Sequence, residues 1–412
     1  MKVKTGYSSF SLGALVYLFV IVILTFSLVT AYFPFFRREW ILWLSALVVS
    51  IAVSPSVYRT HRFYILMLYA LVLVVNVAMG DVYFKENVVI REICYLWIPA
   101  VIYQYCITGE KGNRFSFLVV ATIIIIILIE SISTFFLDLA NPSILRSSFS
   151  EALETSYDRE SYMTQYYKLG MSNYSLPHAL PILIPASIYG IKANGGGIRI
   201  IWFLFLLASL LLCWLSGSST ALMMATFITI VALLTKIGNV EHNVKVLVLL
   251  FVLILPLFYI DSISLWFLDI IERLVSDNSY FMSKVTAFRE TIIYGDAMGD
   301  VASRQELYLK SFDLFKSNAL LGTNEAVGNH STLIDRLSVL GLLGFAIYIV
   351  FLYKQFQFTK RSIGRHSRFF YIEGVIVGIL LLLLKDMDNW ETFLALFTVL
   401  PLQIRLVEKI TT

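Results

Sequence analysis

Charged residues are scarce in this sequence. Lysine, arginine, aspartate and glutamate together make up only 15% of the 412 residues, whereas apolar residues make up 58%. This composition lies far outside that of soluble globular domains. The net charge of +4 is spread over short segments between apolar runs, so it gives no support to nucleic-acid binding. The composition predicts an all-α integral membrane protein, because a helix satisfies its backbone hydrogen bonds internally in lipid.

Cysteine is also rare, and the alternation typical of a β-barrel is missing. Cys94, Cys106 and Cys213 all fall in apolar runs, at spacings that exclude a disulfide framework and a zinc site. The apolar runs are long and continuous, whereas barrel strands are segments of about ten residues with alternating polarity. We therefore expect helices, with no metal and no cofactor.

The apolar runs predict about 12 transmembrane helices in a single polytopic domain that covers residues 1–412. Each run approaches the roughly 20 residues that a helix needs to cross the hydrocarbon core. The first run follows Lys2 and Lys4 and lacks a small-residue cleavage site, so we expect a retained span. The expected spans are roughly 12–33, 40–57, 63–80, 88–107, 115–136, 175–192, 198–216, 218–235, 243–261, 333–353, 369–385 and 388–405.

The basic residues indicate how these spans are oriented. If the N-terminus is cytoplasmic, most lysines and arginines between spans fall on the inner side. The short outer loops then contain only Arg37, Arg38, Lys85 and Lys385. By the positive-inside rule, both termini are expected in the cytoplasm.

Two loops, 137–174 and 262–332, are much longer than the others and are expected on the outer side. A membrane protein usually keeps such segments short unless they carry function. Apolar residues at helical spacing in the second loop predict amphipathic helices that lie on the membrane or over the mouth of the bundle. These residues are Leu265, Leu268, Ile271 and Leu274, and then Tyr308, Phe312 and Phe315.

A capping-box pattern in the second loop singles out Arg304. Ser303 at the N-cap with Glu306 three residues later predicts the start of a helix. Arg304 then falls in the first turn, where a cation is unfavourable unless an anion such as phosphate occupies the helix N-terminus. The alternative is a solvated arginine on a loop helix.

His330 closes the same loop, just before the span that begins near residue 333. Histidine is the side chain best suited to accept a proton near neutral pH. Only His330 and His178 fall on the expected outer side. An interfacial histidine without a catalytic role is the alternative for His330, and a structural role is favoured for His178, which lies between Pro177 and Pro181.

The first outer loop combines an arginine with several tyrosines. Arg159 precedes Gly170, and Tyr166 and Tyr167 lie between them. A guanidinium binds phosphate through two parallel hydrogen bonds, and aromatic rings suit the faces of sugars. Tyrosines are common at membrane interfaces in any case, so the pattern is also compatible with a simple interfacial segment.

Some charged residues lie within or between the expected spans. Arg91 and Glu130 both fall toward the outer leaflet, where they could form an ion pair or line a polar cavity. Asp386 and Asp388 resemble the metal-binding Asp-x-Asp of some glycosyltransferases. A charged turn between two spans is the favoured interpretation of that pair.

Taken together, these features resemble the O-antigen polymerase and O-antigen ligase family of bacterial glycan-assembly enzymes. The matching features include the twelve-span plan, the enlarged late outer loop, and Arg304 on a helix that runs into Leu320-Leu321-Gly322. His330-Ser331 follows, and nine residues later comes Gly341-Leu342-Leu343-Gly344. The resemblance covers residues 200–400 best, and the first half mainly through topology.

Two further points refine this resemblance. The spacing of Arg159 and Gly170 is similar to an arginine–glycine pattern in outer loops of the polymerases. Family members often carry an arginine at the turn between the seventh and eighth spans, where this chain has Ser216-Gly217-Ser218-Ser219-Thr220. Another basic residue, such as Arg289 or Arg336, would have to supply that charge, or the substrate is held differently.

The resemblance implies a GT-C-like membrane protein of the bacterial cytoplasmic membrane. Its implied activity is to join polyprenyl-diphosphate-linked oligosaccharide repeat units into O-antigen, capsule or exopolysaccharide, with inversion and without metal. The implied partners are the lipid-linked glycan, the bilayer, a flippase and a chain-length regulator. His330 would act as general base, oriented by Asp335 or Glu325. The groups implied to bind the diphosphate and glycan are Arg159, Arg304, Arg289, Arg336, Tyr166 and Tyr167.

Two other functions remain as alternatives. A ligase would transfer finished polymer to a lipid or cell-wall acceptor with the same fold and chemistry. A glycan transporter is a different class, and it predicts charged or polar residues at mid-membrane in several spans.

Overall fold

A computed structural model describes most of the chain from residue 55 onward. The described residues are 45, 47–48, 51, 55–79, 86–108, 112–142, 144–145, 166, 169–254, 260–276, 279–323, 325, 328 and 330–411. All regular elements within these ranges are helices. The expected span 12–33, most of 40–57, Arg159 and Tyr167 lie outside the described residues.

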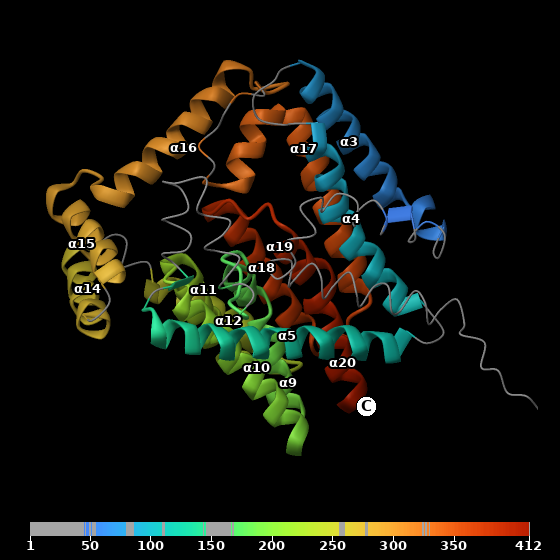
Figure 1. The fold of residues 1–412 in the computed structure, drawn as a ribbon, viewed down its shortest axis with the longest axis horizontal. Helices are drawn as coiled ribbons and strands as arrows, with labels where there is room; N and C mark the ends of the chain where they lie inside the picture. Colours follow the sequence, from blue (N-terminus) through green and yellow to red (C-terminus); the bar gives the residue numbers. More distant parts are fainter. Residues whose placement is uncertain are drawn as a thin grey trace, which may run out of the picture.

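Most apolar runs within the described residues form helices close to the expected bounds. A short 3₁₀ helix, η3 (Pro55–Arg59), precedes the first of them, and α3 and α4 lie side by side in Figure 1. The matching helices are α3 (His61–Met79), α4 (Glu86–Thr108), α5 (Gly112–Ala140), α10 (Gly196–Leu215), α11 (Ser219–Leu234), α12 (Val240–Ile254) and α18 (Arg368–Leu384).

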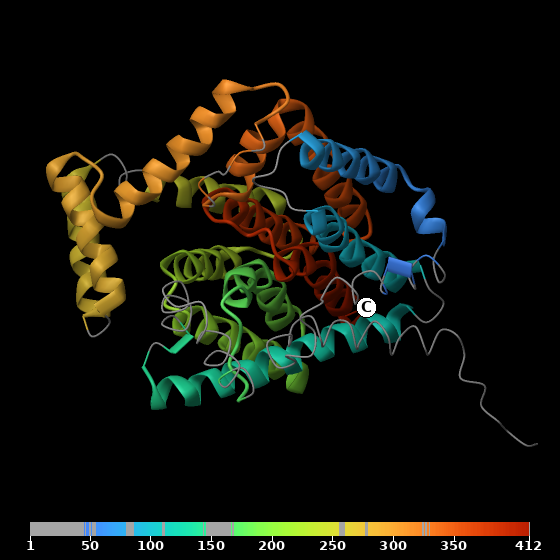
Figure 2. The same ribbon diagram turned by 45° about the horizontal axis from the view of Figure 1, so that its top comes forward.

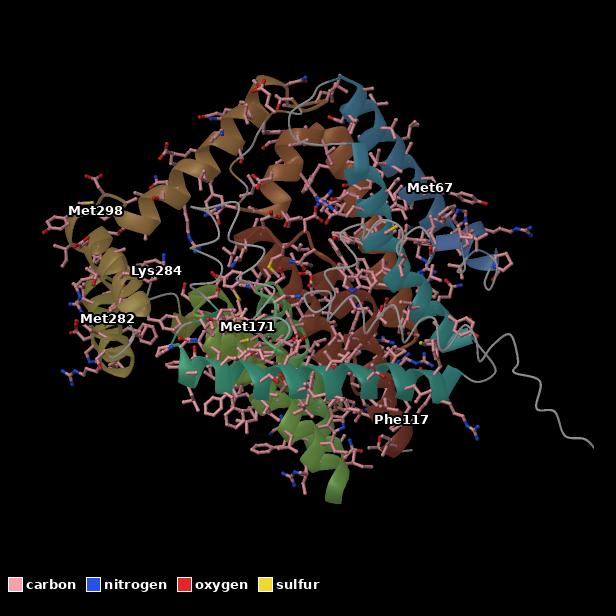
Figure 3. All side chains as sticks on the ribbon, viewed as in Figure 1. Met67, Phe117, Met171, Met282, Lys284 and Met298 are labelled. Atoms are coloured by element: carbon pink, nitrogen blue, oxygen red, sulfur yellow. The ribbon has the colours of Figure 1, made fainter. Side chains whose placement is uncertain are left out.

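Four described segments are long and apolar enough to cross a membrane: His61–Ala78, Arg114–Ala140, Gly196–Leu215 and Thr332–Arg361. Their outer faces carry large apolar side chains, as expected of helices that face lipid. Phe117 on α5, labelled in Figure 3, is 55% exposed. The chain therefore has the architecture of a helical membrane protein, and the count of twelve spans stays a prediction.

The expected span 175–192 is not one continuous helix, which corrects the prediction. The chain forms α8 (Leu176–Ala179), a 3₁₀ turn η4 (Leu180–Ile182) and then α9 (Ile184–Ala193). Pro177, Pro181 and Pro185 stand four residues apart in this segment. Each proline lacks the N–H of a helical hydrogen bond, so the series interrupts the helix and leaves carbonyl groups available to other donors.

The expected span 333–353 lies within α17 (Thr332–Arg361), but it is not straight. Gly341 has φ 61° and ψ −176°, which ends one helical segment and starts another. In Figure 1 α17 is accordingly drawn as an arch. A Cβ at this position would lie 2.5 Å from both the Gly322 nitrogen and the Leu320 carbonyl oxygen, so only glycine fits.

The turn at Leu320-Leu321-Gly322 fills the break in α17. The Leu342 N–H donates to the Ala319 carbonyl at 2.9 Å, and the Leu343 N–H donates to the Leu320 carbonyl at 3.2 Å. The two glycine-containing strings that carry the family resemblance are thus paired through backbone hydrogen bonds.

The segment 262–332, which the sequence predicts as the second outer loop, is helical over most of its described residues. It contains α14 (Asp261–Val275), α15 (Ser279–Tyr294) and α16 (Gly299–Ser317), so the two expected amphipathic stretches are confirmed as helices. Helices α14 and α15 pack against each other and project from one side of the molecule, and α16 leads back to α17 (Figure 2). Lys284 and Met282, on α15, are labelled on this projection in Figure 3.

The last expected span, 388–405, also departs from a regular helix. It consists of α19 (Trp390–Leu394), a π-helical turn η5 (Ala395–Val399) and α20 (Leu400–Thr411). Residues of all three segments are buried among the other helices, including Phe393, Phe397 and Leu400. The loop between α18 and α19, residues 385–389, is thus followed directly by a buried segment, and this loop forms part of the candidate site.

Candidate functional site

The start of α17 brings together His330 and Asp335. The Asp335 carboxylate accepts backbone N–H groups from His330 at 3.1 Å and from Ser331 at 3.2 Å, and it also accepts the Ser311 hydroxyl at 2.6 Å. Asp335 is 2% exposed, whereas His330 is half-buried. The orienting acid suggested by the sequence thus lies next to His330, and these hydrogen bonds fix its main chain.

The loop between α18 and α19 joins the site through Thr332. The Thr332 N–H donates to the Lys385 carbonyl at 3.2 Å, and its hydroxyl accepts the Met387 N–H at 2.7 Å. The same hydroxyl lies 3.3 Å from Asp386 Oδ1. Asp386 and Asp388 therefore belong to a tight charged turn, in line with the favoured interpretation of that pair.

Arg336, one helical turn after Thr332, lies in a buried ionic cluster. Its Nη2 donates to Glu92 Oε2 and to Asp388 Oδ2, each at 2.5 Å, and its Nη1 contacts the hydroxyl of Tyr69. Its guanidinium carbon lies 4.6 Å from the centre of the Tyr348 ring. Arg336 and Glu92 are 2% and 1% exposed. Arg336 and Tyr348 both belong to α17, and the bend at Gly341 allows their side chains to contact each other.

A second polar group lies where α8, α11 and the 385–389 loop meet. His178 Nδ1 lies 2.9 Å from the Tyr174 carbonyl, so it must donate a hydrogen. His178 Nε2 lies 2.7 Å from the Ser218 hydroxyl and also contacts the Lys385 ammonium, which lies 5.0 Å from the centre of the Tyr174 ring. His178 is 1% exposed, and its structural role stays a prediction.

The sequence did not single out Lys385, which lies 207 residues from His178 in the chain. Lys385 lies near the Ser216–Thr220 turn, because its ammonium contacts the His178 ring, which in turn binds the Ser218 hydroxyl. One signal was available, because the sequence places Lys385 in a loop expected on the outer side, where lysine is uncommon.

The pairing of Arg91 with Glu130 considered from the sequence is not formed. The Arg91 guanidinium lies 5.9 Å from the centre of the Tyr95 ring, whereas Glu130 accepts the Ser172 hydroxyl at 3.0 Å. Glu130 is 2% exposed. It faces the segment that leads into α8.

The capping box predicted at Ser303 is wrong. Helix α16 begins at Gly299 with Met298 at the N-cap, and the Ser303 hydroxyl donates to the Gly299 carbonyl at 3.2 Å inside the helix. Glycine with φ 52° can turn the chain into the helix four residues earlier than the serine pattern indicated. Arg304 therefore lies beyond the first turn, and the helix N-terminus does not explain its position.

Arg304 nevertheless lies near the site, because Tyr308, one turn later on α16, contacts the site directly. The Tyr308 hydroxyl donates to the Leu384 carbonyl at 2.9 Å, directly before the 385–389 loop. Burial raises the pKa of Tyr308, and the positive charge of Arg304 opposes that rise. Helix α16 is thus attached to the site by Tyr308 and by Ser311, which binds Asp335.

Other predicted site residues lie elsewhere. Arg289 donates to Asp269 at 2.5 Å and to Glu272 at 2.6 Å, which ties α15 to α14. The hydrogen bond to Asp269 is the main cause that raises the pKa of Arg289. Glu325 is exposed, and Tyr166 packs near Ile144, Leu145 and Met171 in a small apolar cluster. Their positions relative to Arg159 and Tyr167 fall outside the described residues.

The arrangement provides one half-buried histidine, one buried histidine and several cations at the ends of apolar helices. Among the described residues, no group of three or more histidine, cysteine or acidic side chains is arranged to hold a metal ion.

No protein-family model matches the chain, and no curated protein is significantly similar to it in sequence.

Proposed function

We propose that this chain is a polymerase that joins polyprenyl-diphosphate-linked oligosaccharide repeat units into a surface polysaccharide. It would act at the outer face of the bacterial cytoplasmic membrane, with about 12 spans and both termini inside. The observation that carries the proposal is the junction of α16, the start of α17 and the 385–389 loop. There Ser311 of α16 binds Asp335 beside His330 at the start of α17. Thr332 of the same segment binds the loop that carries Lys385.

The proposed reaction requires a proton acceptor and stabilisation of a leaving diphosphate. A hydroxyl of the acceptor sugar attacks the anomeric carbon of the donor, and His330 takes the hydroxyl proton. The bond from the anomeric carbon to the diphosphate oxygen breaks, and the diphosphate leaves with the electron pair. Attack from the opposite face inverts the anomeric configuration. Diphosphate is already a good leaving group, so nearby cations such as Arg304 can stabilise its charge.

Asp335 supports this role of His330. Its carboxylate holds the backbone of His330 and Ser331, so the ring projects from a fixed main chain. A base must lie within hydrogen-bonding distance of the proton it removes, and a fixed backbone limits where the ring can reach.

The test is His330→Ala in a strain that lacks the native gene. We expect loss of polymer with a normal amount of protein in the membrane, and Arg304→Lys should reduce polymer because the two-pronged contact is lost. His61→Ala is the matched control, since His61 is exposed at the start of α3, and it should leave polymer unchanged. Wild-type chain lengths in the His330→Ala strain would rule out the general base.

The same deletion strain separates the polymerase from the ligase. Loss of a polymerase leaves single lipid-linked repeat units, whereas loss of a ligase leaves full-length polymer that is not attached to its acceptor. Accumulation of unattached polymer would therefore replace the proposal with ligase activity.

A glycan transporter is the second candidate, and the buried charges favour it. Glu92, Glu130, Glu373 and Arg336 are each 2% exposed or less within the helix bundle. Charged residues of this kind often mark a transport pathway. Purified protein that elongates a lipid-linked repeat unit without any ion gradient would exclude transport as the primary function.

A further inference from the structure

The ionic cluster around Arg336 contains one more acid than base. Arg336 lies between Glu92 on α4 and Asp388 in the 385–389 loop. Glu92 Oε2 and Asp388 Oδ2 each lie 2.5 Å from the same Nη2 atom, so the two oxygens cannot be more than about 5 Å apart. If both carboxyl groups were ionised, two negative charges would lie close together at a site that excludes most water. One arginine neutralises only one of them.

The hydrogen bonds of the cluster are also incomplete. Glu92 Oε1, Asp388 Oδ1, Arg336 Nε and the Tyr348 hydroxyl are buried and have no hydrogen-bond partner among the described residues. Buried polar atoms are nearly always hydrogen-bonded, so a carboxyl oxygen left without a partner here favours the protonated, uncharged form of its group. Glu92 and Asp388 each have one such oxygen, so either group can carry a proton.

Other charged and titratable groups face this cluster from each packed element. Tyr69 on α3 donates its hydroxyl toward Glu92 Oε2 at 3.5 Å, and Tyr348 on α17 stacks with Arg336. Arg91 precedes Glu92 on α4, and Asp386 precedes Asp388 in the loop. Arg91 is exposed and Asp386 is exposed, so water screens both charges more than those of the buried cluster.

We infer that Glu92 and Asp388 share one bound proton beside Arg336, which makes this cluster a proton-binding site. Glu92 carries the proton because it is 1% exposed, whereas the Asp388 side chain is 20% exposed and pairs with Arg336 as the ionised group. The cluster is then electrically neutral, as expected of a buried ionic group. This site is independent of the proposed polymerase reaction, since it uses neither His330 nor the diphosphate.

The inference predicts opposite results for two isosteric substitutions in the full chain. Glu92→Gln replaces a neutral acid with a neutral amide, so the thermal midpoint in detergent micelles at neutral pH should stay near that of wild type. Asp388→Asn removes the ionised partner of Arg336, so Glu92 must ionise at a position that is only 1% exposed to replace it. This substitution should therefore lower the midpoint by several degrees. Equal destabilisation by both substitutions would overturn the inference, as would a larger loss from Glu92→Gln.

The pH dependence provides a second measurement. A carboxyl group that keeps its proton in the folded state but loses it in the unfolded state makes stability fall as pH rises. Wild-type protein should therefore lose stability between acidic and alkaline pH, and Glu92→Gln should flatten this profile. Glu241→Gln is the control, because Glu241 is 80% exposed on α12, and it should leave the profile unchanged. A Glu92→Gln profile identical to wild type would contradict the bound proton.

If a variant misfolds, infrared spectroscopy of the wild-type protein still tests whether a carboxyl group carries a proton. Wild-type protein at neutral pH should show a protonated carboxyl band that shifts in deuterated water. Lack of any such band would overturn the inference without reference to a variant. A band that disappears in Glu92→Gln assigns the proton to Glu92.

Discussion

Two arginines in this protein make nearly the same contacts in opposite environments. Arg336 bridges Glu92 and Asp388 inside the helix bundle, and Arg289 bridges Asp269 and Glu272 on the outer α14–α15 pair. All four nitrogen–oxygen distances are 2.5 or 2.6 Å. The Arg336 side chain is 2% exposed, whereas that of Arg289 is 29% exposed and its partners are more exposed still.

The comparison teaches that geometry alone does not give the energetic value of an ion pair. Water and salt weaken the Arg289 contacts, so the side-chain ordering they require offsets most of the gain. The Arg336 contacts lack that screening, and breaking them leaves buried charge without compensation. Both arginines were equivalent candidates for a substrate-binding cation in the sequence, and burial separates their roles.

Arg336→Met should have the largest effect. It removes the cation but keeps an unbranched apolar side chain, and it leaves the partly buried Asp388 without its positive partner. We expect a loss of about 3–5 kcal/mol in the free energy of unfolding. Titration with a denaturing detergent in mixed micelles measures this loss in the free energy of unfolding. Unchanged stability would mean that the cluster is as well solvated as the outer pair.

Gly341→Ala should be nearly as damaging, because the bend at Gly341 brings Arg336 to Tyr348. The alanine would adopt a positive φ and press against the Leu320 carbonyl and the Gly322 nitrogen. Left-handed backbone strain and overpacking together cost roughly 2–5 kcal/mol. Gly197→Ala is the matched control, because nothing lies within 4 Å of its added Cβ. The same detergent titration should show little change for that control, and equal losses in both variants would count against the tight fit at Gly341.

Asp335→Asn should have an intermediate effect. The amide keeps the shape of the side chain but loses the charge that accepts hydrogen bonds from His330, Ser331 and Ser311. Hydrogen bonds to a charged group contribute about 1.5–3 kcal/mol. The loss should appear both in the unfolding titration and as reduced polymer, since the backbone of His330 is released. Full activity with reduced stability would show that Asp335 does not position His330.

Arg289→Ala should have the smallest effect. Its partners are exposed, so the thermal midpoint in micelles should not change measurably. Polymer yield should also match wild type if Arg289 only ties α14 to α15. A clear loss of polymer with unchanged stability would restore the hypothesis, drawn from the sequence, that Arg289 binds substrate.

The sequence predicted helix positions well where the pattern was local. Long apolar runs defined α3, α4, α5 and α10, because hydrophobic length is sufficient to specify such helices. It failed where the backbone departs from a helix inside an apolar run. The prolines of 177–185 and the glycine at 341 are visible as letters, but whether a neighbour fills the resulting break depends on tertiary packing.

The candidate site could be predicted only in part for a similar reason. His330 and Asp335 lie five residues apart, so their proximity follows from one loop and one helical turn. Lys385 and His178 lie 207 residues apart, and Arg336 and Glu92 lie 244 apart. No periodicity or local motif encodes such contacts, and a single sequence does not identify them.

The pairing of Gly322 with Gly341 has a consequence for motion. The amides of Leu342 and Leu343, at the broken start of the second part of α17, are satisfied by carbonyls of the outer turn. These amides can exchange with solvent only when the outer turn lifts away, so the break and the end of α16 open together as one cooperative unit. A displacement of α16 is therefore transmitted directly to α17, which is long enough to cross a membrane.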